Sequence, residues 1–377
     1  MNSDQANRAP CAEGSANAKS EGTNLVVPAS RRLTLSRRTI LLGAAASALF
    51  AAGCSIFNTP ARSGHSRQVI KRLAFGSCAQ QERNQPIWDK ISAANPDLFV
   101  FIGDNIYGDT EDMLLMKKKY VRLASKPEFA RFRSQVPIVA TWDDHDYGVN
   151  DGGREYPQKE ESKRLMLDFF REPQGSERRM RPGVYTSYTM GPPGRVVQLI
   201  LLDLRWFRGP LVYDAANDAY LPDKTGATML GAEQWAWLEA ELRKPADLRI
   251  IASSTQFSSP DHRFEKWANF PGEKQKMLAL LDRLRINNAV VISGDMHFGE
   301  LSSEKTPQGV TLYDLTSSGL NFFEVGAHYP NRNRMAIHDK SPNFGFIEID
   351  WDRSTPKVSL QVRDDAGAIA IRQDVQF

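Results

Sequence analysis

Four short apolar runs of this 377-residue chain each end in residues whose side chains can bind metal ions. These ends combine thiol, carboxylate, phenol and imidazole groups, the donors that metal ions use in proteins. Taken singly, an Asp after a strand is often a cap or a turn former, and a lone His is often structural. Four such ends in one chain indicate a metal site. They are Gly76-Ser77-Cys78, Gly103-Asp104-Asn105-Ile106-Tyr107, Asp143-Asp144-His145-Asp146 and Gly294-Asp295-Met296-His297.

The run from Asp143 to Asp146 is the strongest of these signals. It places three carboxylates around the imidazole of His145. Carboxylates this close repel one another unless cations or solvent compensate their charge. The run therefore favours a bound cation over a purely structural loop.

The apolar runs in front of these ends predict strands, and the segments between them predict helices. The runs are rich in Val, Ile and Leu and do not alternate with polar residues, which is typical of strands covered on both faces. The predicted strands are 73–75, 98–102, 138–140, 196–202, 250–252 and 289–292. The predicted helices are 113–124, 159–170, 231–242 and 274–284.

This strand–helix alternation predicts an α/β architecture with helices on both sides of the strands. Towards the C-terminus the predicted strands 310–315, 345–349 and 358–362 follow one another without long helices, which predicts a mixed sheet. Because the candidate ligands come from both halves of the chain and must meet, residues 70–377 are predicted to form a single domain. The carboxyl ends of the strands are the expected place for the site.

The N-terminal residues predict an export signal. A cationic stretch containing Arg37-Arg38 precedes the apolar run 41–52, which is too short for a permanent membrane span. The arginine pair after Ser36 resembles a twin-arginine signal, which implies the twin-arginine export machinery as a partner and a periplasmic or extracellular location. An ordinary signal with incidental arginines is the alternative. We predict a signal peptide over residues 1–54 and a linker over 55–69.

Residues 51–54 also resemble a lipobox, in which Cys54 would carry a lipid anchor. Ala51 departs from that pattern, which usually has Leu, Val or Ile at this position. Cys11 and Cys54 both lie in the leader, so the folded body retains Cys78 alone and has no internal disulfide. Cys78 is then either a small buried hydrophobe or a metal-bound thiolate.

The charge balance gives no support to one class of partner. Six of the 48 Lys and Arg residues and three of the 45 Asp and Glu residues lie in residues 1–54, so 42 of each remain in the body. A body without net charge gives no support to a nucleic-acid-binding surface.

The order Gly103-Asp104-x-x-Tyr107, Asp144-His145 and Gly294-Asp295-x-His297 resembles the motif series of the metallophosphoesterases. Further matching segments make the chain similar to the alkaline phosphatase D (PhoD-like) family over residues 70–350. This resemblance implies a metallo-dependent phosphatase-like four-layer sandwich, with two mixed β-sheets flanked by helices. The segments are Phe75–Cys78, Thr141–Asp146, Leu202–Arg205, Gln234–Leu238, Phe264–Trp267 and Ser317–Asn321.

The resemblance also implies roles for the ligand-type residues. Cys78 stands where related enzymes have a histidine ligand, and Asp144 stands at the usual asparagine position. Asp104 would bridge two metals and Tyr107 would bind as a phenolate. The remaining implied roles are metal ligation by Asp295 and His297, a phosphate-facing catalytic role for His145, and for Gln256 a position where relatives often have another histidine ligand.

The implied cofactors are two metal ions, Fe³⁺ and Ca²⁺, while the residue types alone also allow Mg²⁺, Mn²⁺ or Zn²⁺. Such a pair, about 3.5–4 Å apart, lowers the pKa of a shared water from about 15.7 toward 7. The resulting hydroxide attacks phosphorus in line, and His145 would stabilise the charge or protonate the leaving group. The predicted function is hydrolysis of small phosphate esters by an exported enzyme.

Several further residues are weaker candidates for substrate contacts. Arg205 and Arg208 follow a strand and are candidate phosphate donors, with surface ion pairing as the alternative. Asn105 is a candidate hydrogen-bond donor to the substrate, and Asn321 is a candidate pocket residue.

The sequence leaves other functions open. Within the hydrolases, phosphodiester or phospholipid substrates compete with monoesters, so a phospholipase-D-like phosphodiesterase is one alternative. An exported, non-catalytic metal-binding or redox protein is another. A copper site would need two histidines near Cys78, and the acidic run 143–146 disfavours it.

Overall fold

The computed structural model describes residues 64–352 and 355–377. The predicted signal peptide, Cys54 and most of the predicted linker lie outside the described residues. Gly64–Ser66, at the end of that predicted linker, forms strand β1 and pairs in parallel with β5.

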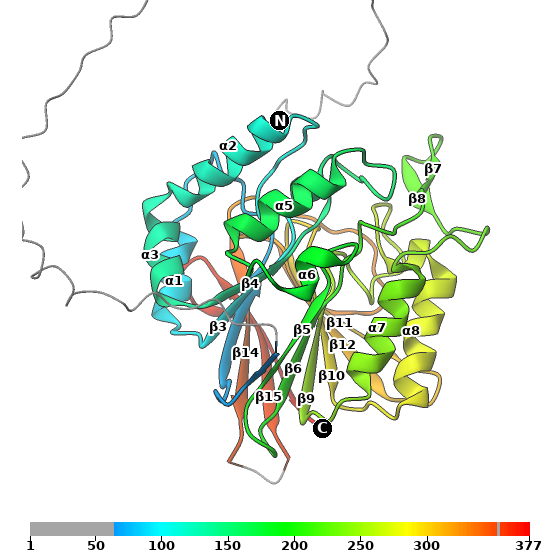
Figure 1. Ribbon diagram of the computed structural model, residues 1–377. Coiled ribbons are helices and arrows are strands. Elements are labelled where there is room, and N and C mark those ends of the chain that lie inside the picture. The colour runs from blue at the N-terminus through cyan, green and yellow to red at the C-terminus, as the bar shows by residue number, and fades with distance from the viewer. Residues whose placement is uncertain (1–63, 353–354) are drawn as a thin grey trace, which may run out of the picture. The chain divides into compact units, whose positions relative to one another are not determined.

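Two large mixed sheets form the centre of the fold (Figure 1). The first has eight strands, in the order β1 (Gly64–Ser66), β5 (Thr186–Met190), β6 (Val197–Leu201), β9 (Leu248–Ala252), β10 (Ala289–Ser293), β12 (Thr311–Ser317), β11 (Gly299–Lys305) and β13 (Arg334–His338). The second has six strands, in the order β16 (Ile369–Gln376), β15 (Lys357–Asp364), β14 (Asn343–Asp350), β2 (Arg72–Gly76), β3 (Leu98–Ile102) and β4 (Ile138–Thr141). Each sheet contains both parallel and antiparallel pairs.

The apolar runs are strands because their side chains alternate between two cores. In β3, Leu98, Val100 and Ile102 belong to the core shared by the two sheets. Phe99 and Phe101 point to the opposite face, where they meet the helices. Since successive side chains of a strand point to opposite faces, a strand covered on both sides is apolar throughout.

Helices cover the outer face of each sheet (Figure 1). The outer core of the six-stranded sheet contains residues from α1 (Ile87–Ala93), α2 (Met113–Ala124), α3 (Pro127–Gln135) and α5 (Lys159–Phe169). The outer core of the eight-stranded sheet contains residues from α7 (Gly231–Leu242) and α8 (Pro271–Arg283). The short elements are α4 (Asp144–Tyr147), α6 (Glu177–Met180), η1 (Trp267–Asn269) and the hairpin strands β7 (Val212–Asp214) and β8 (Ala219–Leu221).

The order helices, sheet, sheet, helices confirms the predicted four-layer sandwich with two mixed sheets. The predicted helices 113–124 and 231–242 match α2 and α7. The prediction did not include α1, α3, β5, β11, β13 or β16. Several of these are amphipathic or short, so neither an apolar run nor a long helical stripe marks them in the sequence.

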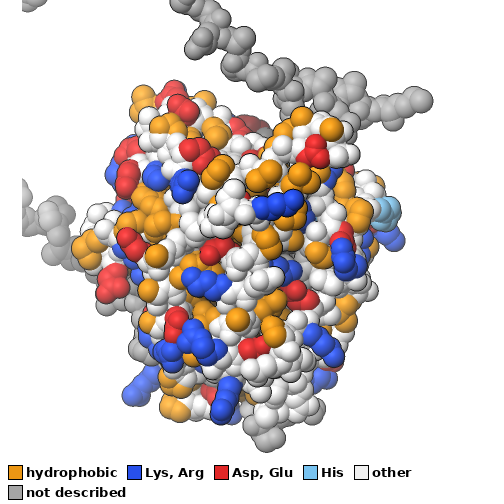
Figure 2. Space-filling view, turned by 90° about the vertical axis from the view of Figure 1, so that its right-hand side faces the viewer, with side chains coloured by type: hydrophobic (Ala, Val, Ile, Leu, Met, Phe, Trp, Pro, Cys, Tyr) orange, Lys and Arg blue, Asp and Glu red, His pale blue; other side chains and the backbone are white. Residues whose placement is uncertain are grey.

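In the described part of the chain, none of the helices has the length and apolar character that a membrane span requires. Figure 2 shows the face that carries α7, α8 and the β7–β8 hairpin, where Lys and Arg side chains alternate with Asp and Glu. This face has no single-sign charge patch of the kind that binds nucleic acid.

Candidate metal centre

The carboxyl ends of strands from both sheets meet at the candidate site. Strands β2, β3 and β4 are parallel neighbours, so the loops that follow them emerge at one edge of the six-stranded sheet. Strand β10 belongs to the other sheet, and the loop after it carries Asp295 and His297. A bridge between Ser77 and Ser318 joins the two sheets at this edge. The sandwich therefore brings residues from distant parts of the chain together.

Three groups of side chains in the described residues have the geometry of a metal site. They are Cys78, Asp104 and His297; Asp104, Asp144 and His145; and Asp104, Asp143, Asp144 and Asp295. Within each group the ligand atoms lie within 4.8 Å of one another. Because Asp104 belongs to all three, it lies where a bridging carboxylate would have to be.

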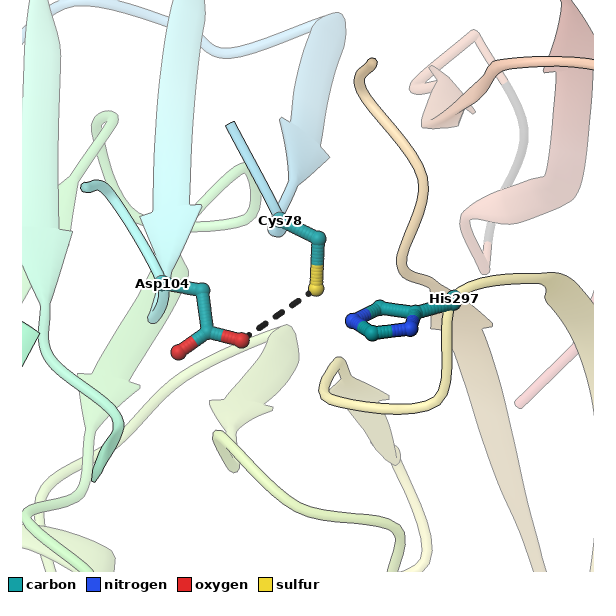
Figure 3. Close-up of side chains that lie close together, drawn as sticks. All are labelled: Cys78, Asp104 and His297. Carbon is teal, nitrogen blue, oxygen red and sulfur yellow. Dashed lines mark hydrogen bonds between the residues drawn. The ribbon is translucent and has the colours of Figure 1, made fainter. Parts of the chain in front are cut away.

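The first group is shown in Figure 3, where the three side chains point toward one another. The thiol of Cys78 donates a hydrogen bond to Oδ2 of Asp104 over 3.3 Å. The hydroxyl of Tyr107 lies 3.1 Å from Nε2 of His297. The structure thus gathers Cys78, Tyr107 and His297 around one oxygen of Asp104, and the third group adds Asp144 and Asp295.

Asp143 is a member of the acidic group that the sequence did not predict as a ligand. Its Oδ1 accepts hydrogen bonds from Arg205 over 2.6 Å and from Ser254 over 2.7 Å. Its Oδ2 is buried without a hydrogen-bond partner. Asp143 is thus held by one oxygen and presents the other to the acidic group.

Several buried oxygens at the site have no hydrogen-bond partner in the described part of the chain, which indicates whether the site suits cations. Oδ1 of Asp104, Oδ2 of Asp143 and Oδ1 of Asn105 have no hydrogen-bond partner among the described residues. Leaving such a group unsatisfied costs roughly 1–3 kcal/mol, and more for a charged one. Oxygen donors of this kind are what a hard cation binds. The donor set therefore fits a pair of metal ions.

Without bound cations, burial makes the ionised forms of these ligands unfavourable. Burial raises the pKa of Asp104 and of Asp295 well above the usual range, and neighbouring anionic groups raise both further. Burial likewise raises the pKa of Cys78 to about 11, and raises that of Tyr107. Metal binding requires these groups to lose their protons, so ligation and proton release are coupled here.

Asp144 differs from its neighbours. Burial opposes its ionisation, but the charges of His145 and Arg205 and two backbone N–H groups hold its pKa below the usual range. The N–H groups are those of His145, at 2.8 Å, and Asp151, at 2.7 Å. Asp144 is therefore the carboxylate of the group that stays ionised most readily.

The backbone at the site adopts a conformation that side chains usually avoid. The φ angles of Cys78, Asp104, Asp295 and His297 are 61°, 46°, 72° and 62°. For a residue other than glycine this left-handed conformation costs about 1–2 kcal/mol, and such strain clusters at functional sites. Four of the six predicted ligands are thus held in strained positions by the surrounding structure.

Asp146 holds the loops after β3 and β4 together. Its Oδ1 accepts the backbone N–H groups of Asp104 at 3.1 Å and Asp143 at 2.8 Å. Its Oδ2 accepts from the amide of Asn105. The last carboxylate of the acidic run therefore positions the others.

His145 lies beside the site and is oriented by a residue that the sequence analysis missed. Its Nδ1 is 2.6 Å from Oδ1 of Asp109, and its ring packs on that of Tyr107 at 4.4 Å. Burial alone would lower the pKa of His145, but the charges of Asp144 and Asp104 and the bond to Asp109 raise it well above the usual range. No motif marks Asp109 in the sequence. The one signal that could have found it is its position two residues after Tyr107.

The structure places both arginine candidates in a buried ion-pair network. Arg205 is fully buried, with Asp143 at 2.5 Å and Glu265 at 2.6 Å from its guanidinium. Arg208 is equally buried, and its Nε is 3.1 Å from Glu265. These positions correct the expectation of phosphate contact or surface pairing. Each guanidinium is enclosed in the protein and pairs with a buried carboxylate, so it stabilises the site and does not face the substrate.

Gln256 and Asn321 are also engaged elsewhere. The amide nitrogen of Gln256 donates to Glu300 and Thr316. The amide of Asn321 is hydrogen bonded to the backbone of Gln80 and Asn84. This corrects the expectation that Asn321 lines the substrate pocket, since both of its polar atoms hold the structure. Gln256 and Asn105 differ, because the side-chain oxygen of each has no hydrogen-bond partner among the described residues.

A family model for PhoD-like phosphatases matches residues 116–350 of the chain. The chain belongs to the PhoD-like phosphatase family. The matched range contains Asp144, His145, Asp295 and His297. Cys78, Asp104 and Tyr107 precede it, so their place in the centre rests on the geometry described above.

The chain is similar to known proteins in sequence and in structure. Alkaline phosphatase D of Bacillus subtilis (strain 168) is 24% identical over 275 residues, which are 60% of this chain and 45% of that protein. The chain thus spans less than half the length of this relative. A solved structure of PhoD matches with a TM-score of 0.65 at 17% identity, over 84% of this chain and 70% of that one. GAP50, the anchor in the inner membrane complex of Plasmodium, matches with a TM-score of 0.54 at 12% identity, over 82% and 90%. At these identities the two structures show a shared fold and no more.

The crowded carboxylates predict a pH-dependent stability of the metal-free protein. Burial raises the pKa of Asp143 from 3.8 to about 7, so the folded chain holds this proton more tightly than the unfolded chain. The stability that Asp143 contributes is complete below about pH 4 and is lost as the pH rises to about 7. We expect bound metal to remove this loss, because cations replace the protons.

Thermal unfolding of the metal-free and metal-loaded protein between pH 4 and pH 8 measures this effect. The melting temperature of the loaded form should exceed that of the metal-free form by a margin that widens by several degrees across this interval. The loaded form is the internal control for carboxylates elsewhere in the chain. A constant margin would contradict the prediction.

Proposed function

We propose that the chain hydrolyses phosphate esters with the help of two metal ions that share Asp104. The observation that carries this proposal is the membership of Asp104 in all three candidate ligand groups. Family membership supports it as well. When bound, the two cations supply Lewis acidity, which activates water and neutralises the charge of the phosphate.

The donor chemistry suggests which cation each group would hold. Cys78, Tyr107 and His297 offer a thiolate, a phenolate and an imidazole, and the charge of a trivalent iron offsets the cost of deprotonating the thiol and the phenol. Asp144, Asp295 and Asp143 offer oxygen donors, which suit a hard divalent ion such as Ca²⁺. We therefore propose Fe³⁺ and Ca²⁺ as the pair, with Asp143 added to the predicted ligand set.

His145 would act on the leaving group. Since Nδ1 is hydrogen bonded to Asp109, Nε2 is the nitrogen that remains to donate a proton to the departing alkoxide. Asp109 holds the ring in this orientation and favours its protonated form. It is a positioning residue in this scheme.

Reconstitution with metals tests the proposed activity. Protein stripped of metal and reloaded with iron and calcium should regain hydrolysis of p-nitrophenyl phosphate or its bis ester. Elemental analysis should find two metals per chain, and the visible spectrum should contain a phenolate-to-iron band that Tyr107→Phe removes.

Asp104→Asn should lose activity by a factor of about 10³ or more, since it affects both cations. Asp89→Asn, at a surface ion pair of α1, is the matched control.

The result also decides between substrate classes. Higher activity on the bis ester than on p-nitrophenyl phosphate would assign the enzyme as a phosphodiesterase and not as a phosphomonoesterase. A chain that binds two metals but hydrolyses neither ester would contradict the proposed function and favour a non-catalytic metal-binding protein.

The His145–Asp109 pair generates a separate prediction. His145→Ala should lower kcat by a factor of about 10²–10⁴ while two metals stay bound. Asp109→Asn should lower kcat less, and should move the alkaline limb of the kcat/KM profile to lower pH, because His145 loses a carboxylate that raises its pKa. Asp365→Asn, in an exposed turn, is the control. An unchanged alkaline limb in Asp109→Asn would contradict the positioning role.

We also propose that the enzyme acts outside the cytoplasm, after export by the twin-arginine machinery and with a lipid anchor on Cys54. The leader around Arg37-Arg38 and the residues 51–54 support this proposal. Mass spectrometry of the mature protein should find an N-terminal lipidated Cys54. A free N-terminus beyond Cys54 would exclude the anchor, and normal export of a variant with Arg37 and Arg38 changed to Lys would exclude the pathway.

A further inference from the structure

An exposed arginine lies beside the metal centre and has no assigned role. The guanidinium carbon of Arg83 lies over the ring of Phe322, 4.2 Å from its centre, which is within cation–π distance. In the described part of the chain no carboxylate is within ion-pair distance of this guanidinium, whereas many surface arginines here have such a partner. Arg83 therefore presents a positive charge that the protein does not neutralise.

Phe322 connects Arg83 to the metal centre. Its ring lies 4.4 Å from that of His297 and 5.1 Å from that of Tyr107. Its backbone N–H donates to the carbonyl of Cys78 over 3.2 Å. The guanidinium is thus one aromatic ring away from two predicted ligands, close enough that its charge contributes to the field at His297.

The loop that carries Arg83 is held in place rather than free. Asn321 accepts the backbone N–H of Gln80 at 2.7 Å and donates to the carbonyls of Gln80 and Asn84 at 2.9 and 3.2 Å. The side chain of Gln80 accepts the backbone N–H groups of Glu82 and Arg83 at 2.7 and 3.1 Å. Asn321 therefore fixes the position of Arg83 relative to Phe322, the next residue in its own loop.

The contact with an aromatic ring uses none of the N–H donors of a guanidinium. These five donors lie in the plane of the group, where they match a carboxylate or phosphate with two parallel hydrogen bonds. The scissile phosphate would already be neutralised by the two cations. An additional cation one ring away is suited to a different anionic group of the same molecule.

We propose that Arg83, held by Phe322 and Asn321, binds a second anionic group of the substrate. The preferred substrates are then phosphate esters whose organic part carries a carboxylate or another phosphate about one aromatic ring from the scissile phosphorus. This inference rests on the proposed function and adds a substrate class to it.

A pair of esters that differ in one carboxylate tests the inference. The native enzyme should hydrolyse 4-carboxyphenyl phosphate with a kcat/KM about tenfold above that for phenyl phosphate, the worth of one hydrogen bond to a charged group. Arg83→Gln should reduce this ratio to about one, and Arg83→Lys should retain part of it. Arg131→Gln, at a surface ion pair of α3, is the matched control and should keep the full ratio.

Two outcomes would overturn the inference. An equal fold-loss of kcat/KM on both esters in Arg83→Gln would mean that Arg83 contacts the scissile phosphate itself. An unchanged kcat/KM on each ester would mean that Arg83 only packs on Phe322. Differences in leaving-group reactivity cancel because the ratio is compared between variants.

A binding measurement separates this inference from the proposed function. Calorimetry on metal-loaded protein compares phenylphosphonate with 4-carboxyphenylphosphonate, neither of which is hydrolysed. Tighter binding of the carboxylated compound that disappears in Arg83→Gln supports the subsite even if turnover is absent. Equal affinities in the native protein would overturn the subsite even if both esters are hydrolysed.

Discussion

The mutual repulsion of buried carboxylates is the constraint on which the site depends. Asp104, Asp143, Asp144 and Asp295 place oxygens within 4.8 Å of one another, and the first three of these residues are buried. Such a group is stable only when protons or cations compensate its charge. Arg205 compensates part of the charge from behind, through Asp143. The negative charge that Arg205 leaves uncompensated is what a pair of metal ions would neutralise.

The two-sheet sandwich makes this crowding possible. Parallel neighbours β2, β3 and β4 deliver three loops to one edge, and β10 delivers the fourth from the other sheet. The core between the sheets fixes their separation, since side chains of both sheets, including those of β3 and β10, belong to it. The strained backbone at Cys78 and His297 is then tolerated because rigid strands on both sides determine it.

A second ring of residues surrounds the ligands and orients them. Asp146 holds the loops of β3 and β4, Asp109 holds His145, and Asn321 holds the loops that carry Arg83 and Phe322. Outer contacts of this kind commonly affect metal affinity and activity nearly as much as the ligands. In the proposed scheme, the same kind of contact serves metal binding, proton transfer and substrate choice.

The sequence by itself determined the apolar, covered strands, the long helices and the identity of the ligand-type residues. These follow from local properties: apolar runs form covered strands, and chemically distinctive side chains follow them. Only the tertiary structure decided what the polar neighbours do. Arg205 meets Asp143 across 62 residues and Asn321 meets Gln80 across 241. An arginine or asparagine has the same local appearance whether it faces a substrate or a buried carboxylate, because its role depends on which distant segment the fold places beside it.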